Sequence, residues 1–556
     1  MQRRRWTRSI LAASVTLVGS MLTVVPLAAE AAPASRPFTV SKAAAFDVSP
    51  PLRELAAAPA RAAPEALPDE RGPVAADKGH SGDGALQSAV TRRPSDPAEL
   101  ISPPIADFEG VANTANPRLI SPPDPDGDVG PNHYVQVVNV QYAVYTKAGE
   151  LLAGPAQIGT LFADFPVTDC AGFNGDPIVL HDQHSDRWLI TQFTVQGPEY
   201  WNCIAISTSP DPTGTYYRYA FSSGENFPDY PKYGVYPETY FLSTREFAAD
   251  DTPYIGAYAL EKKRMLLGDP NARAVSFIVP LGDTPHLLGD GLLPTDWDGD
   301  RPPKKGTPNW FVGNQDDGGQ YGATFDALNV WEFDIDWKPA PMASFELTAQ
   351  IPVAQFDSVF PCSPGPRNCI AQPDTANKVD ILSVRQRPTW RLAYRHFGGY
   401  ESLVTTRSVE ARPGVAGMRW FELRRPLGAT GLSLHQEGTY APDDGVHRWM
   451  GSIAQDRAGN LALGYSVSNA VDVYPGIRYT GRLAGDPLGA MDRGEQTLIA
   501  GSGSQLTSAR WGDYTAMHVD PVDDCTFWYT NQYYETSSNN GWQTRIGSFR
   551  FPSCRF

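Results

Sequence analysis

Two short segments each contain three aspartates in the sequence pattern Asp-x-Asp-Gly-Asp, and these side chains could bind a metal ion. Carboxylates that converge on one glycine-bent loop suit a hard divalent cation, so both loops are candidate Ca²⁺ sites. The candidate ligands are Asp124, Asp126 and Asp128 in the first loop and Asp296, Asp298 and Asp300 in the second. An EF-hand also needs a glutamate at the twelfth loop position, where Val135 stands, so that motif is excluded. An ordinary Asp-rich turn is the alternative interpretation, and no organic cofactor is expected.

A second group of side chains offers guanidinium, aromatic, carboxyl and imidazole groups at or near the starts of strand-like runs. A guanidinium can grip a uronate carboxylate in two parallel hydrogen bonds, while an aromatic ring covers the apolar face of a sugar. The candidate substrate-binding residues are Arg448, Trp449, Arg478, Arg510 and Trp511, and the candidate catalytic residues are His133, Asp176, Asp513 and Tyr514. The chemistry would be hydrolysis of a glycosidic bond or elimination beside a uronate. For each residue the alternative is a structural tie between neighbouring sheets.

Several common enzyme classes lack their motifs in this chain. The sequence has no Gly-x-Ser-x-Gly elbow, no His-Glu-x-x-His pair and no phosphate-cradling glycine loop. It therefore argues against a serine hydrolase, a zinc metalloprotease and a nucleotide-dependent enzyme.

The N-terminal residues predict export from the cell. Four arginines precede an apolar stretch from Ile10 to Ala29, and the small residues Ala29 and Ala31 flank Glu30. We therefore predict a signal peptide over residues 1–31 and a secreted, extracellular chain without membrane insertion. Residues 32–103 are rich in Ala and Pro and predict a flexible leader, followed by one folded domain over 104–556.

Charge and cysteine usage agree with an extracellular location. The net charge of −16 repels nucleic acid and anionic membranes, so neither is expected as a partner, and a monomer is expected. An even number of cysteines in an exported chain predicts disulfides, and six cysteines permit 15 pairings. Proximity in the sequence favours the pairs Cys170–Cys203, Cys362–Cys369 and Cys525–Cys554.

Beyond residue 104 the chain consists of short runs of Val, Ile, Tyr, Phe and Trp separated by Gly, Pro, Asn and Asp, which predicts an all-β fold. A unit of apolar strand, Asp- or Gly-containing turn and second apolar strand recurs, most clearly over 175–190, 449–465 and 511–529. Comparable starts near Gly130, Pro231, Phe311 and Lys378 bring the number of units to seven.

Radial repetition of such units leaves few exposed sheet edges, so the sequence predicts a disulfide-stapled β-propeller with seven blades as the leading count. Six or eight blades, or a pair of β-sandwiches, are the alternatives. In a propeller the first strands of all units surround one axis. Residues as distant in sequence as Asp176 and Arg510 would then meet in one funnel.

Specific runs resemble a family of exported bacterial β-propeller proteins of largely unassigned function. The resemblance rests on 175–180 with 186–188, on 510–514 with 519–521, and on 525–531, and it covers the chain after residue 104. The fold is more distantly similar to sialidase-like propellers. The repeated Ser-x-Asp-x-Gly-x-Thr-Trp box of sialidases is missing, however, and this argues against a true sialidase.

Together these patterns predict a secreted propeller that binds an extracellular polysaccharide or other glycan through its central funnel. If it is an enzyme, it would also cleave that glycan, and it is expected to be a glycoside hydrolase or a polysaccharide lyase. The alternative is a non-catalytic extracellular binding or adhesion module. An enzyme should bring ionisable groups together in one place, whereas an adhesin should expose an aromatic or apolar patch away from the axis.

Overall fold

The computed structural model describes residues 37–57, 79–87, 100–381 and 387–555. The predicted signal peptide lies outside these residues. The described part is almost entirely β-structure, as predicted, with only short helices. These helices are α1 Leu52–Leu55, η2 Asn113–Ala115, α2 Ile158–Leu161, η3 Thr168–Ala171, α3 Lys262–Leu266 and η4 Pro285–Leu287. No described helix is both long enough and apolar enough to span a lipid bilayer.

The first half of the domain forms three sheets in which consecutive strands pair antiparallel. The first sheet contains β4 Asp126–Val129, β5 His133–Val138, β6 Gln141–Thr146 and β7 Leu151–Gln157. The second contains β8 Gly175–Asp182, β9 Arg187–Phe193, β10 Tyr200–Ser207 and β11 Tyr216–Gly224. The third contains β12 Phe227–Val235, β13 Tyr240–Phe247, β14 Pro253–Leu260 and β15 Arg273–Pro280.

The second half continues the same meander. One eight-stranded sheet contains β16 Leu293–Asp298, β17 Asn309–Gln315, β18 Ala327–Asp336, β19 Met342–Pro352, β20 Leu392–His396, β21 Tyr400–Arg412, β22 Val415–Pro426 and β23 Ser433–Tyr440. A further sheet contains β24 His447–Gln455, β25 Leu461–Ser468, β26 Tyr474–Arg482 and β27 Glu495–Gly501. The last contains β28 Ala516–Val519, β29 Thr526–Tyr533 and β30 Gln543–Arg550.

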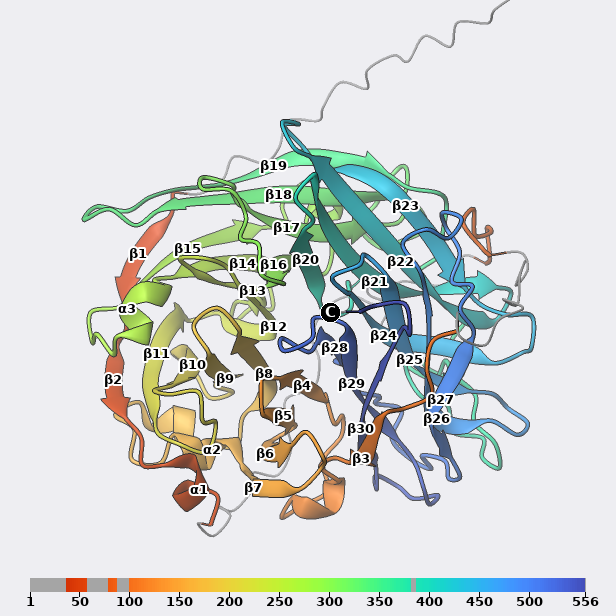
Figure 1. Cartoon of the computed structure of the whole chain (residues 1–556), viewed down its shortest axis with the longest axis horizontal. Coiled ribbons are helices and arrows are strands. Elements are labelled where there is room, and N and C mark those ends of the chain that lie inside the picture. Colours follow the sequence, from red (N-terminus) through yellow and green to blue (C-terminus); the bar gives the residue numbers. More distant parts are fainter. Residues whose placement is uncertain (1–36, 58–78, 88–99, 382–386, 556) are drawn as a thin grey trace, which may run out of the picture. The chain divides into compact units, whose positions relative to one another are not determined.

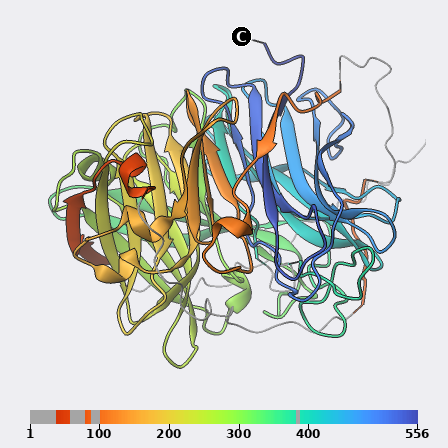
Figure 2. The same ribbon diagram turned by 90° about the horizontal axis from the view of Figure 1, so that it is seen from below.

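The sheets are arranged around an axis. The first strands of the meanders follow one another in contact from β4 through β8, β12, β16, β20, β24 and β28 back to β4. Figure 1 shows them around the middle of the view, and Figure 2 shows the strands running roughly along the axis. The fold is a β-propeller. Because β16 and β20 pair in parallel and join two four-stranded meanders, strand pairing records six sheets, and the count of seven blades stays a prediction.

Aromatic side chains fill the space between facing sheets. Between the third sheet and the next, Phe241 and Phe277 each lie 5.2 Å, between ring centroids, from Phe333. Phe311 and Phe345 complete this buried cluster. The side chains that alternate along each strand therefore pack sheet against sheet, as the strand pattern in the sequence requires.

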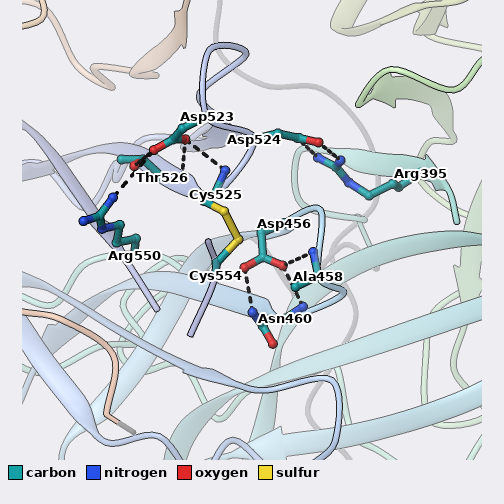
Figure 3. The surroundings of a disulfide bond; sticks show 10 residues. All are labelled: Arg395, Asp456, Ala458, Asn460, Asp523, Asp524, Cys525, Thr526, Arg550 and Cys554. Atoms are coloured by element: carbon teal, nitrogen blue, oxygen red, sulfur yellow. Dashed lines mark hydrogen bonds and ion pairs between the residues drawn. A yellow bond between two sulfur atoms is a disulfide. The ribbon is translucent and has the colours of Figure 1, made fainter. Parts of the chain in front are cut away.

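The last sheet is closed by a strand from the N-terminal side of the domain. β3, Ala106–Glu109, pairs antiparallel with β30, so the two ends of the propeller meet in one sheet. A disulfide fastens the same region: Cys525, just before β29, is bonded to Cys554. Asp523 accepts hydrogen bonds from the backbone of Cys525 and Thr526 beside this disulfide (Figure 3).

All three predicted disulfides are confirmed. Cys170–Cys203 and Cys362–Cys369 are present together with Cys525–Cys554, and no described cysteine is free. Disulfides of this number indicate an oxidising environment.

The predicted flexible leader is wrong over its described parts. β1, Thr39–Lys42, pairs with the outer strand β15, and β2, Ala45–Val48, pairs with the outer strand β11 (Figure 1). Residues 79–87 lie against β23, where Leu86 forms a parallel bridge to Thr439. We call residues 79–87 the strap segment. These pieces cover outer strands whose backbone groups would otherwise be unpaired, which is the physical reason for their order.

Candidate functional site

Four of the six aspartates in the two Asp-rich runs, Asp126, Asp128, Asp296 and Asp298, lie in strands, and several of the six tie blades together. Asp126 and Asp128 point to the same side of β4, because side chains alternate along a strand. Asp126 accepts a hydrogen bond from the backbone N–H of Val179 at 2.8 Å, and Asp128 accepts one from His181 at 2.7 Å. Both donors belong to β8 in the next blade. These carboxylates act as structural ties between neighbouring blades.

The three aspartates of each run do not gather at one point, and the prediction that each run forms its own Ca²⁺ loop stays a prediction. Asp124 accepts from the backbone N–H of Asp513 at 2.7 Å, away from the partners of Asp126 and Asp128. Asp124 does not belong to any described group of three or more possible metal ligands whose ligand atoms lie within 4.8 Å of one another. In the second run Asp300 is exposed at the surface and lies outside such a group as well.

The other two aspartates of the second run meet a histidine from a different blade. Asp296 and Asp298 of β16 place carboxylate oxygens within 4.8 Å of a ring nitrogen of His518 in β28. The guanidinium of Arg391 lies between the two carboxylates, 3.1 Å from Asp296 Oδ2 and in contact with Asp298. Asp296 also accepts from the backbone N–H of Val235 at 2.9 Å. This cluster already contains its own cation, and we assign it a structural role.

The opposite end of the axis, where the innermost strands begin, has an irregular backbone. The pairing register shifts at the starts of β8, β12 and β24. Asp176, Tyr230 and Met450 stand at these shifts with positive φ angles of 46°, 54° and 46°. Bulges of this kind re-aim side chains and occur preferentially near functional sites.

Six side chains from four blades meet at this end, and we call them the mouth cluster. They are Asp124, Asp176, Lys232, Arg510, Asp513 and Tyr514. The Tyr514 hydroxyl donates to Asp176 Oδ2 at 3.0 Å. Lys232 Nζ lies 3.6 Å from the ring centroid of Tyr514. Asp176 and Arg510 are half-buried, whereas the other four are buried, so these two are the members that reach solvent.

Opposite charges surround Asp513. Arg510 Nη2 lies 3.2 Å from Asp513 Oδ2, and Arg387 Nη1 lies 3.7 Å from the same oxygen. Arg387 also contacts Asp290 at 2.9 Å and has no exposed side-chain surface. It comes from the long segment between β19 and β20, a part of the chain with no strand pattern, and sequence reasoning missed it.

The electrostatics of the mouth cluster favour a protonated Asp176. Burial, together with the neighbouring carboxylates of Asp229 and Asp513, raises the pKa of Asp176 to about 7, although Lys232 and the Tyr514 hydrogen bond oppose the rise. Burial also raises the pKa of Asp124 well above its usual range and lowers that of Lys232 well below its own. The site therefore contains a carboxyl group that can hold a proton near neutral pH.

The structure leaves five of the predicted site residues out of this cluster. Arg448 is buried and binds Asp444 at 2.8 Å and Glu495 at 2.8 Å, and Arg478 binds the same Glu495 at 3.2 Å. Trp449 and Trp511 pack on each other at 5.2 Å with no exposed surface, so neither offers a face to a sugar. His133 begins β5, which runs antiparallel to β4, and therefore lies toward the other end of the sheet.

Comparisons with known proteins assign no family. No protein-family model matches the chain, and no curated protein matches it. The resemblance to an exported family therefore stays a prediction.

Solved structures with related folds differ widely in what they do. An alpha-L-arabinanase of Penicillium chrysogenum complexed with arabinobiose has a TM-score of 0.33 and 11% identity, over 70% of this chain and 96% of that one. The polysaccharide lyase Uly1 has a TM-score of 0.32 and 9% identity, over 82% and 98%. A complex of S. cerevisiae dbp5 with nup159 and gle1 has a TM-score of 0.32 and 8% identity, over 84% and 100%. At such low similarity no activity is carried over to this chain.

Proposed function

We propose that this protein is a secreted propeller that binds extracellular glycans at the mouth cluster and cleaves them. The observation that carries the proposal is the arrangement of Asp176. Asp176 is half-buried, its carboxyl group has a pKa of about 7, and it lies in the same cluster as a second carboxylate, Asp513, and a half-buried guanidinium, Arg510. Cleavage of a glycosidic bond needs two carboxyl groups in different protonation states.

Each side chain has a role in this scheme. Protonated Asp176 donates its proton to the oxygen of the leaving sugar, and the Tyr514 hydroxyl orients it through the 3.0 Å hydrogen bond. Asp513, as a carboxylate, takes a proton from the water molecule that attacks the sugar carbon on the other side of the bond. Arg510 binds a carboxylate or hydroxyl groups of the substrate, because its guanidinium retains solvent contact while it holds Asp513.

The test is a panel of acidic and neutral polysaccharides incubated with the purified chain. Reducing ends report hydrolysis, absorbance of unsaturated uronate reports elimination, and affinity electrophoresis reports binding. We expect cleavage of at least one polysaccharide, a loss of at least tenfold in rate for Asp176→Asn, and a fall in rate as the pH rises above about 7.

A matched pair of arginine variants separates the mouth cluster from the rest of the molecule. Arg510→Lys should weaken binding and cleavage, because a compact ammonium cannot form the two parallel hydrogen bonds of a guanidinium. Arg478→Lys, which alters a half-buried arginine bound to Glu495 instead, should leave both unchanged. Equal effects of the two variants would remove the mouth cluster from the proposal.

A non-catalytic binding module is the second candidate, and one observation favours it. Only Asp176 and Arg510 of the mouth cluster reach solvent, while Asp124, Lys232 and Tyr514 are at most 1% exposed. With so little accessible polar surface, few groups of the cluster can reach the reacting bond of a glycan, which favours recognition over catalysis. Binding of a polysaccharide without release of reducing ends or unsaturated products would decide for this candidate.

A further inference from the structure

The strap segment is fastened to the propeller by backbone and side-chain contacts. Gly84 N donates to Gln355 O at 2.8 Å, Gln87 N donates to Thr439 O at 3.0 Å, and Thr439 N donates to Ala85 O at 2.9 Å. The first bond ties the segment to the chain after β19, and the other two form a single parallel bridge to β23. Such bonds hold the segment in one register against the domain.

At the start of the strap segment a histidine faces two carboxylates of the propeller. His80 Nδ1 lies 3.2 Å from Asp357 Oδ2 and 3.8 Å from Glu410 Oε2. The carboxylate side chains are 8% and 3% exposed, respectively, and the histidine side chain is 18% exposed. Asp357 lies in the segment after β19 and Glu410 in β21, so three separate parts of the chain contribute one group each.

The geometry of the three groups does not suit a proton shared in a hydrogen bond. Although His80 Nδ1 is buried and 3.2 Å from Asp357, it has no hydrogen-bond partner among the described residues, because the alignment is wrong for one. Ligands of a tetrahedral zinc ion at about 2.0–2.2 Å are separated from each other by about 3.3–3.6 Å. The separations of 3.2 and 3.8 Å lie close to this range, so the spacing of the three groups fits ligands around one metal ion.

Both carboxylates also accept hydrogen bonds from neighbouring groups of the chain. Asp357 accepts from Ser81 N at 2.7 Å and from Ser81 Oγ at 2.6 Å, and Glu410 accepts from Gly414 N at 2.6 Å. Outer hydrogen bonds of this kind orient metal ligands. One imidazole with two carboxylates is a ligand set for a first-row transition metal, since Ca²⁺ prefers oxygen ligands alone.

We propose that His80, Asp357 and Glu410 bind one divalent transition-metal ion, with zinc as the representative, and that this ion clips the strap segment to the propeller. The site is distinct from both Asp-rich runs and from the mouth cluster, and it does not depend on the proposed function. A solvent molecule would take the fourth position, because the three protein ligands leave it open.

The test uses the full secreted chain, freed of metal with a chelator and desalted. Titration with Zn²⁺ against a chromophoric chelator should show about one tight equivalent per chain, and Co²⁺ should give the visible absorption of a four-coordinate ion. Zn²⁺ should also raise the melting temperature. His80→Ala should weaken zinc binding at least tenfold and abolish the rise, because it removes the only nitrogen ligand and leaves the propeller intact.

Two further variants make the result decisive. Glu410→Gln keeps the size of the side chain and should weaken zinc binding as His80→Ala does, whereas His435→Ala, at a half-buried histidine of β23 outside the three-residue cluster, should bind zinc as the unaltered chain does. The proposal is overturned if zinc binds the unaltered chain no more tightly than the His80→Ala variant. It is equally overturned if Glu410→Gln has no effect on tight binding.

Discussion

Replacing Asp83 by alanine removes one of the two carboxylates that contact the buried guanidinium of Arg419. Asp83 Oδ1 lies 2.8 Å from Arg419 Nη1, and neither side chain has exposed surface. After the substitution Arg419 keeps Glu437 and the backbone oxygen of Ala354 as partners. A buried charge that loses one partner destabilises a protein by about 3–5 kcal/mol, and the remaining partners favour the lower end of that range.

This loss converts into a measurable shift of the melting temperature. An unfolding entropy of about 2.1 cal/mol/K per residue over roughly 500 residues is on the order of 1 kcal/mol/K. A loss of about 3 kcal/mol should therefore lower the melting temperature by about 3 °C, measured by scanning calorimetry. Asp443→Ala is the matched control, because its side chain is 87% exposed and its change should cost almost nothing. If both variants melt at the same temperature, the strap segment does not contribute to the stability of the propeller.

Three other outcomes follow from the packing. Burial raises the pKa of Glu246 to about 7, above its ordinary 4.5, so between these values the folded state holds a proton that the unfolded state releases. Stability should therefore fall as the pH rises through this window, and Glu246→Gln should flatten the fall in chemical denaturation. Replacing both Cys170 and Cys203 by alanine opens a link across 33 residues and should cost about 3–4 kcal/mol in the same assay. Trp511→Ala should destabilise the fold by about 3–5 kcal/mol without a specific loss of glycan binding, because the ring is fully buried.

The strand pattern and the cysteine spacing carried the prediction of the fold. Alternating apolar runs with Gly- and Asp-rich turns correspond to the observed strands, for example 175–180 in β8 and 526–529 in β29. The three disulfide pairs follow from proximity in sequence, because each links neighbouring parts of one region. Both patterns depend only on residues close together in the sequence. Such local patterns predict this fold well, because its sheets are built from consecutive strands.

The order of the leader could not be predicted from its composition. A segment rich in Ala and Pro has little apolar side-chain surface to bury, which is typical of disordered segments. β1 and β2 are held instead by backbone hydrogen bonds to the outer strands β15 and β11. The strap segment is held by the ion pair between the buried Asp83 and Arg419. Pairing with a sheet edge uses groups that every residue has, so composition does not reveal it.

The candidate site was predicted in part. Asp176, Arg510, Asp513 and Tyr514 do meet, because each stands where an innermost strand begins. The prediction that Trp449 and Trp511 bind substrate is not supported, because burial of so large a ring stabilises the fold. The local sequence does not show whether a tryptophan is buried in the core or exposed to a ligand. The Asp-x-Asp pattern did not distinguish a metal-binding loop from a strand. In a strand it places both carboxylates on one side, facing the next blade.

The most direct test of the central claim is the polysaccharide panel run in parallel on the unaltered chain and on Asp176→Asn. We expect the unaltered chain to release reducing ends or unsaturated uronate from at least one glycan, and the variant to melt at a similar temperature with at least a tenfold lower rate. A chain that neither binds nor cleaves any glycan, or an Asp176→Asn variant that works at the full rate, would contradict the assignment of this end of the axis as the functional site.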